Sequence, residues 1–286
     1  MAGDPDPAQV AARLRGLRAF LLLYGATRSW LWLLLDAPIP GLALSAGALT
    51  ACFAASLLSR WATPATRLAL WVVLFQVAQT LPLTHNHLFL ELFALGLLAI
   101  VDDDAGEDGA LALRALQWTT ALVLFHTGLQ KVLHGLYFQG EFLAFMVGQG
   151  ERFAAPFQAV LPAGEVARLQ GYDALRTGAG PYRVDSLPFL LVSNGVWIAE
   201  IALAPLLLVR RTRALAAAAA AGLVLVIQLA AREVGFALLF VNLLLLFAGR
   251  APGLRLLPLW AGLALVGLGV ASGLLPWGSL LEGVNP

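Results

Sequence analysis

The sequence has few charged residues and only one cysteine, and each scarcity excludes a class of protein. Only 12% of the 286 residues are charged, whereas soluble domains carry about 25%, so a soluble globular protein is excluded. Intrinsic disorder is excluded as well, because 60% of the residues are hydrophobic. Cys52 has no partner for an internal disulfide and does not indicate a redox compartment. The formal net charge of +1 argues against nucleic-acid binding.

The sequence contains many long apolar runs, which predict an all-α, polytopic transmembrane helix bundle. A spanning helix needs about 20 mostly apolar residues, and about nine runs approach that length. These runs lie at residues 17–35, 41–58, 67–84, 87–101, 112–134, 187–209, 214–230, 234–249 and 254–274. We therefore expect a single transmembrane domain over residues 1–286, in which the run 87–101 is short enough for a half-span.

The distribution of arginines predicts how the bundle lies in the membrane. Cytoplasmic loops are enriched in lysine and arginine, and the cluster of Arg210, Arg211 and Arg213 is the strongest such signal. With this cluster inside, the N-terminus is cytoplasmic and the C-terminus is outside. We expect the inner membrane of a bacterium as the location and the lipid bilayer as the main partner. The acidic turn 102–104 is interpreted as a solvated loop end, and no metal site is predicted.

The segment at residues 135–186 does not fit the pattern of spanning runs. It is too polar to cross a membrane and too apolar to be a free linker. Amphipathic stretches lie around 138–147 and 153–161, and they predict interfacial helices that lie on the bilayer or cap the bundle. Because this is the largest outer element, we expect a functional site at the outer face.

Polar side chains within apolar runs are costly in a membrane and often functional. The candidate ligand-binding residues are His85, His87, His126, Gln130 and Gln228. The residues expected to be structural are Glu91, Asn194, Glu200 and Arg232. Glu200 is expected to face the bundle and to pair with Arg232 or Gln228, because a buried carboxylate needs a partner. The histidine spacings match no zinc motif.

Lys131 is the candidate catalytic base. It is the only lysine among the 18 basic residues, and a desolvated lysine can become neutral, whereas arginine stays charged. His134 lies three residues further along and is the candidate proton relay. In the alternative interpretation, Lys131 extends to the outer interface and pairs with a carboxylate, for which Glu141 is one candidate.

Three motifs carry a resemblance to a known family. The stretch 117–131 with Phe138-Gln139-Gly140-Glu141 resembles the aromatic-x-x-Gly-x-x-Lys helix of the vitamin K-dependent gamma-carboxylase superfamily, also called the horizontally transferred transmembrane domain. The stretch 86–90 resembles the Asn-His-x-Tyr-Leu element of that family. Glu200, Pro205 and the basic turn 210–213 resemble its Glu-x-x-x-x-Pro helix, a pattern shared with the lipase maturation factors.

The resemblance implies roles for specific residues. In the carboxylases the lysine deprotonates reduced vitamin K, which makes Lys131 the base and His87 a pocket residue. Gln228 stands where the family has a histidine, and the large lumenal region that binds the protein substrate does not follow. We therefore expect acid–base or redox chemistry on a quinone-like or lipid ligand, with a reduced quinone or vitamin K-like molecule as the implied cofactor.

Two other functions remain open at this point. The chain is alternatively a non-catalytic helper in the folding or maturation of secreted or membrane proteins. A transporter is a weaker alternative, because the polar residues concentrate toward the outer end rather than at the midplane. The sequence does not indicate which protein partners bind or whether the chain is an enzyme.

Overall fold

The computed structural model describes residues 6–34, 39–81, 86–102, 104–149, 151–172, 182–231 and 233–247. These residues form helices without any strand among them, which confirms the predicted all-α class for this part of the chain. The chain divides into two compact units, and each is described by itself. The first holds the residues up to Trp118 together with the segment from Glu233, and the second begins at Thr119 and ends after α11.

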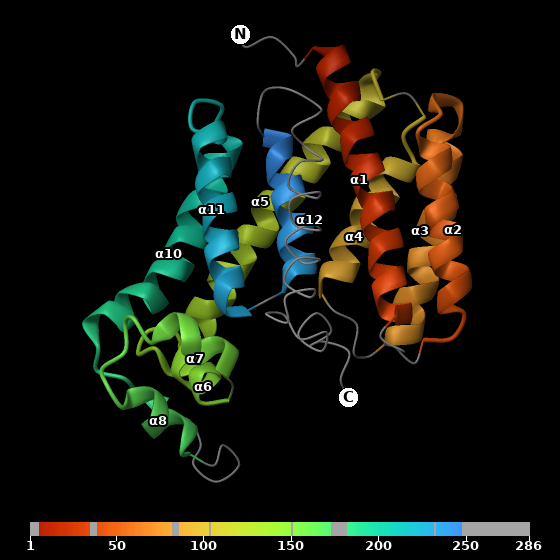
Figure 1. The fold of residues 1–286 in the computed structure, drawn as a ribbon. Helices are drawn as coiled ribbons and strands as arrows, with labels where there is room; N and C mark the ends of the chain where they lie inside the picture. The colour runs from red at the N-terminus through yellow and green to blue at the C-terminus, as the bar shows by residue number, and fades with distance from the viewer. Residues whose placement is uncertain are drawn as a thin grey trace. The chain divides into compact units, whose positions relative to one another are not determined.

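The first unit is a bundle of long helices. Its members are α1 (Pro7–Leu34), α2 (Leu42–Ser56), η1 (Ser59–Trp61), α3 (Ala62–Thr80), α4 (Asn86–Ala99), the start of α5 (Glu107–His134), α12 (Val234–Leu244) and η3 (Leu245–Phe247). Helix α2 packs against α1 and α3, α3 packs against α4, and α12 contacts α1 and α4 (Figure 1). Helix α1 begins where the Asp6 carboxylate accepts the backbone N–H of Ala8 at 3.1 Å, a capping contact.

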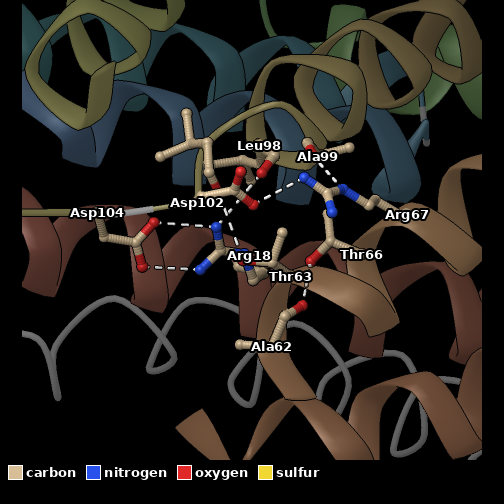
Figure 2. A network of polar contacts seen from close by, with 10 residues as sticks. Arg18, Ala62, Thr63, Thr66, Arg67, Leu98, Ala99, Asp102 and Asp104 are labelled. Atoms are coloured by element: carbon tan, nitrogen blue, oxygen red, sulfur yellow. Dashed lines mark hydrogen bonds and ion pairs between the residues drawn. The ribbon is translucent and has the colours of Figure 1, made fainter. Parts of the chain in front are cut away.

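Two arginines hold the turn that follows α4 (Figure 2). Arg18 of α1 donates to both carboxylate oxygens of Asp104, at 2.7 and 2.9 Å. Arg67 of α3 donates to Asp102 at 2.7 Å and to the carbonyl of Ala99 at 2.9 Å. The carboxylates at both ends of this acidic turn therefore bind arginine. No group of three His, Cys, Asp or Glu side chains within the described ranges is arranged to hold a metal ion.

The second unit combines a helical hairpin with a small helical layer. It contains the rest of α5, then α6 (Glu141–Gln149), α7 (Glu151–Phe157), α8 (Glu165–Gln170), α10 (Leu187–Leu208) and α11 (Arg213–Ala231). Helices α10 and α11 pack along each other, and α6 packs against α7 and α8 (Figure 1). The short helices share an apolar core in which Val147, Leu169 and Phe189 are fully buried. The described residues between 135 and 186 thus include the helices α6, α7 and α8 with a shared core, while their expected place at the bilayer interface stays a prediction.

The predicted runs from 17–35 to 234–249 each contain a helix, whereas the run 254–274 lies outside the described residues. Among the described helices, only α10 is both long and apolar enough to cross a membrane. Helices α2, α4, α11 and α12 with η3 contain shorter apolar stretches. The structure therefore does not support the expected number of nine spans. Length is one reason: α4, for example, has 14 residues, while a span needs about 20.

Candidate functional site

The site around Lys131 is built where α5 crosses α10 at very short distance. A Cβ atom on Gly128 would lie 2.8 Å from Cγ1 of Ile201 and 3.0 Å from the carbonyl oxygen of Trp197. Only glycine fits there, so the backbones of the two helices approach closely at this point. Lys131 lies one helical turn after Gly128, and Glu200 lies on α10 beside the crossing. The crossing therefore brings the two charged side chains together.

Lys131 and Glu200 form a largely buried ion pair. The lysine Nζ donates to Oε1 of Glu200 at 2.9 Å and to Oε2 at 2.8 Å, and more weakly to the carbonyl of Thr127 at 3.4 Å. Only 18% of the Lys131 side chain and 6% of the Glu200 side chain are exposed. All three N–H bonds of the ammonium thus have acceptors. Neither charge would be tolerated there alone, because an unpaired buried charge is costly.

The turn after α5 completes the surroundings of the pair. Helix α5 ends because Gly135 adopts a positive φ of 72°, which favours glycine. The next turn then carries Tyr137 over the ammonium, with the Nζ of Lys131 5.5 Å from the ring centroid. Burial, together with the negative charge of Glu200, raises the pKa of the Tyr137 phenol, so this group stays neutral.

Helix α10 anchors this turn through two consecutive polar residues. Ser193 Oγ donates to the carbonyl of Tyr137 at 2.7 Å, and Asn194 Nδ2 donates to the carbonyl of Phe138 at 3.1 Å. The Asn194 oxygen accepts from the indole N–H of Trp197 at 3.0 Å. Asn194 and Ser193 therefore hold the turn in place from α10.

The polar stripe predicted beside Lys131 lies on another face of α5. His126, Gln130 and His134 are all exposed, while Lys131 points toward Glu200. The structure thus separates the lysine from the three residues expected to act with it. Lys131 and His134 share the last turn of α5, but their side chains point in different directions. No contact in the structure tests the expected proton relay between them, so it stays a prediction.

Two expected pairings are corrected by the structure. Glu200 pairs with Lys131 rather than with Gln228, whose amide nitrogen and oxygen are buried without a hydrogen-bond partner. Arg232, the other expected partner, lies outside the described residues. Glu141 does not bind Lys131 either, because it pairs with Arg183 at 2.9 Å. The sequence could not identify these partners, since each depends on how separate helices are placed.

The histidine and glutamate predicted near residue 87 belong to the first unit. His87 is partly buried in the first turn of α4 and Glu91 is fully buried one turn later, whereas His85 lies outside the described residues. Glu91 forms an ion pair with Arg28 of α1, which in turn donates to Gln76 of α3 at 2.7 Å. The structure therefore gives Glu91 a buried partner.

Several residues around the Lys131–Glu200 and Arg28–Glu91 pairs were not singled out by the sequence. The residues missed are Arg28, Gln76, Thr127, Tyr137 and Ser193. Arg28 was visible as a charge in the middle of an apolar run, and that signal alone marks a buried ion pair. Tyr137 and Ser193 gave no signal, because tyrosine and serine are common at helix ends.

Comparisons with protein-family models, with curated proteins and with solved structures gave no match to this chain.

Proposed function

We propose that the chain is an integral membrane protein, a polytopic helix bundle with a proton-transfer site for a quinone-like or lipid ligand. The site consists of Lys131 and Glu200, with Tyr137 above the ammonium. The observation that carries the proposal is the burial of the chain's single lysine against a carboxylate at the α5–α10 crossing. Ionisable side chains in apolar helices are expensive, and they commonly mark functional sites. The motif resemblance to the gamma-carboxylase superfamily points to the same lysine.

Exposed apolar side chains support the membrane location. Leu44, Trp71, Leu133 and Leu215 each expose two thirds or more of their surface on helices α2, α3, α5 and α11. Soluble monomers rarely expose large apolar patches, whereas lipid-facing helices do so along their length. The proposed orientation keeps the N-terminus in the cytoplasm of a bacterial cell and places the Lys131 end of α5 outside.

The geometry suggests how the pair transfers a proton. In the ion pair, Lys131 holds three protons and Glu200 holds none. Moving one proton from lysine to glutamate leaves an amine and a carboxylic acid, and the net charge of the pair stays zero. The amine then takes the proton of a ligand hydroxyl and becomes an ammonium again. This ammonium stabilises the new ligand oxyanion at its side.

The substitution Lys131→Arg tests this role. Arginine keeps the charge and the contact with Glu200, but it cannot act as a base at neutral pH. The test reconstitutes the full chain in lipid nanodiscs, adds reduced phylloquinone, and follows its oxidation in air by absorbance. We expect the variant to lose at least about 100-fold in rate, the usual contribution of a general base. Leu122→Met, which changes an exposed side chain on the same helix, should keep the wild-type rate.

Two results would contradict the proposal. A wild-type rate in Lys131→Arg would remove the lysine from the chemistry. If the wild-type protein oxidised reduced phylloquinone no faster than empty nanodiscs do, reduced phylloquinone would be excluded as a substrate. Mass spectrometry of the lipids that co-purify in mild detergent then tests the lipid class directly.

A non-catalytic helper is the second candidate, and one observation favours it. All three N–H bonds of the Lys131 ammonium already have acceptors within the protein, as in a purely structural ion pair. A helper whose ion pair only fixes α5 against α10 should tolerate arginine in every assay, because arginine binds a carboxylate at least as well. The arginine variant therefore separates the two candidates.

A further inference from the structure

The first unit contains a second buried polar cluster, centred on Arg28. Its guanidinium pairs with Glu91 and donates to Oε1 of Gln76 at 2.7 Å. Gln76 donates in turn to Oγ of Ser29 at 2.8 Å, and Ser29 donates to the carbonyl of Gly25 at 2.8 Å. Helices α1, α3 and α4 thus share one chain of buried hydrogen bonds.

Three polar atoms of this cluster lack a hydrogen bond of normal geometry. They are Nε of Arg28, Oε1 of Glu91 and the hydroxyl of Tyr24, which faces the Arg28 guanidinium. All three residues are more than nine-tenths buried, and the Arg28 guanidinium lies 5.6 Å from the centroid of the Tyr24 ring. Buried polar groups are nearly always satisfied, so three unsatisfied atoms on touching side chains indicate a binding position.

Two glycines let the backbones of α1 and α12 lie close to these atoms. A Cβ atom on Gly25 would lie 2.9 Å from Oε1 of Glu91, and one on Gly235 of α12 would lie 3.1 Å from the hydroxyl of Tyr24. By contrast, a Cβ on Gly96 of α4 would have no neighbour within 4 Å. The two glycines therefore border two of the three unsatisfied atoms, and a side chain at either position would crowd them.

We infer that Tyr24, Arg28 and Glu91 bind one uncharged hydroxyl group, supplied by water or by a membrane-soluble alcohol. The charges of Arg28 and Glu91 cancel, so a charged ligand would leave a net charge in an apolar interior. Nε of Arg28 needs an acceptor, and Oε1 of Glu91 needs a donor. A carbonyl supplies only an acceptor and an N–H supplies only a donor, whereas a hydroxyl supplies both. Tyr24 then supplies a third contact.

Infrared spectroscopy and native mass spectrometry of the full chain test this inference. Spectra of the protein in nanodiscs are compared in ordinary and oxygen-18 water, where a bound water gives an isotope-shifted O–H band. A bound alcohol instead gives a stoichiometric mass adduct after gentle release from detergent. We expect one of these two signals in the wild type and its loss in Tyr24→Phe and Gly25→Ala. Gly96→Ala is the matched control and should keep the signal.

Thermal unfolding of Tyr24→Phe gives an independent readout. If a hydroxyl group is bound, the variant removes one of its contacts and lowers Tm. If the position is empty, the variant removes an unsatisfied buried hydroxyl and raises Tm. A raised Tm, or the absence of both spectroscopic signals in the wild type, would overturn the inference. Lys131→Arg lies outside this cluster and should leave both spectroscopic signals unchanged, so this test is separate from that of the proposed proton-transfer site.

Discussion

Lys131 and Glu200 are 69 positions apart in the chain, and each makes the burial of the other tolerable. A buried ion pair adds little stability compared with apolar residues of the same size, but losing one partner is costly. The pair is therefore better explained by a function than by stability alone. The Arg28–Glu91 pair invites the same interpretation, because Glu91 is fully buried.

A double-mutant cycle at this pair should show strong coupling. We expect Lys131→Met to lower the free energy of unfolding by about 3 kcal/mol, because Glu200 is left buried without its partner. Lys131→Met combined with Glu200→Leu should cost less than Lys131→Met alone. Unfolding in a denaturing detergent, followed by circular dichroism, measures both. Additive effects of the two substitutions would mean that the side chains do not interact.

Gly128 should be intolerant of alanine. The added methyl group meets the Trp197 carbonyl oxygen at 3.0 Å, so the α5–α10 crossing must open. We expect a loss of about 1–3 kcal/mol in the free energy of unfolding, as is usual for an overpacked contact. Gly195→Ala on α10 is the matched control, since nothing lies within 4 Å of its Cβ position, and it should be neutral or slightly stabilising. Equal effects at the two positions would argue against the close crossing.

At the scale of elements, the turn after α4 depends on side chains from two other helices. Arg18 binds Asp104 with only 3% of the arginine side chain exposed, while Arg67 binds Asp102 with 51% exposed (Figure 2). The two ion pairs therefore differ in solvation although they hold the same turn. Burial, rather than the number of charges, decides which of them matters for stability.

The two aspartates should respond differently to substitution by asparagine. Asp104→Asn leaves the charge of buried Arg18 without its partner and should cost about 1–3 kcal/mol. Asp102→Asn should cost less than about 1 kcal/mol, because exposed ion pairs contribute little. Thermal unfolding at low and high salt measures both effects, and only the Asp102 effect should shrink in high salt. Similar losses for the two variants would contradict this assignment of burial.

At the scale of the whole molecule, the described helices coincide with predicted apolar runs, whereas the predicted number of membrane spans is not supported. Helix α10 covers Leu187–Leu208 against the predicted 187–209, yet α1 begins at Pro7 rather than at residue 17. Helix α5 begins at Glu107 instead of residue 112, with Glu107 and Asp108 in its first turn. Backbone hydrogen bonds continue past the point where apolar side chains end, so hydropathy underestimates the length of these helices.

Reporter fusions test the proposed orientation. A fusion within the outer segment, after Ala163, and a fusion after Arg213 lie on the two sides of α10. We expect an active alkaline phosphatase at the first position and an active cytoplasmic reporter at the second, because the arginine cluster at 210–213 stays inside. Equal signals at the two positions would show that α10 does not cross the membrane.

The amino-acid sequence by itself determined the helical class and the residues that carry unusual charge. Apolar runs longer than a barrel strand favour helices, and a lysine or glutamate within such a run stands out without any structure. Which charges meet was decided only by the tertiary structure. Lys131 reaches Glu200 because Gly128 lets α5 approach α10, and Arg28 reaches Glu91 because α1 packs beside α4. Helix contacts depend on three-dimensional packing, and no local pattern in one sequence encodes the partner of a buried charge.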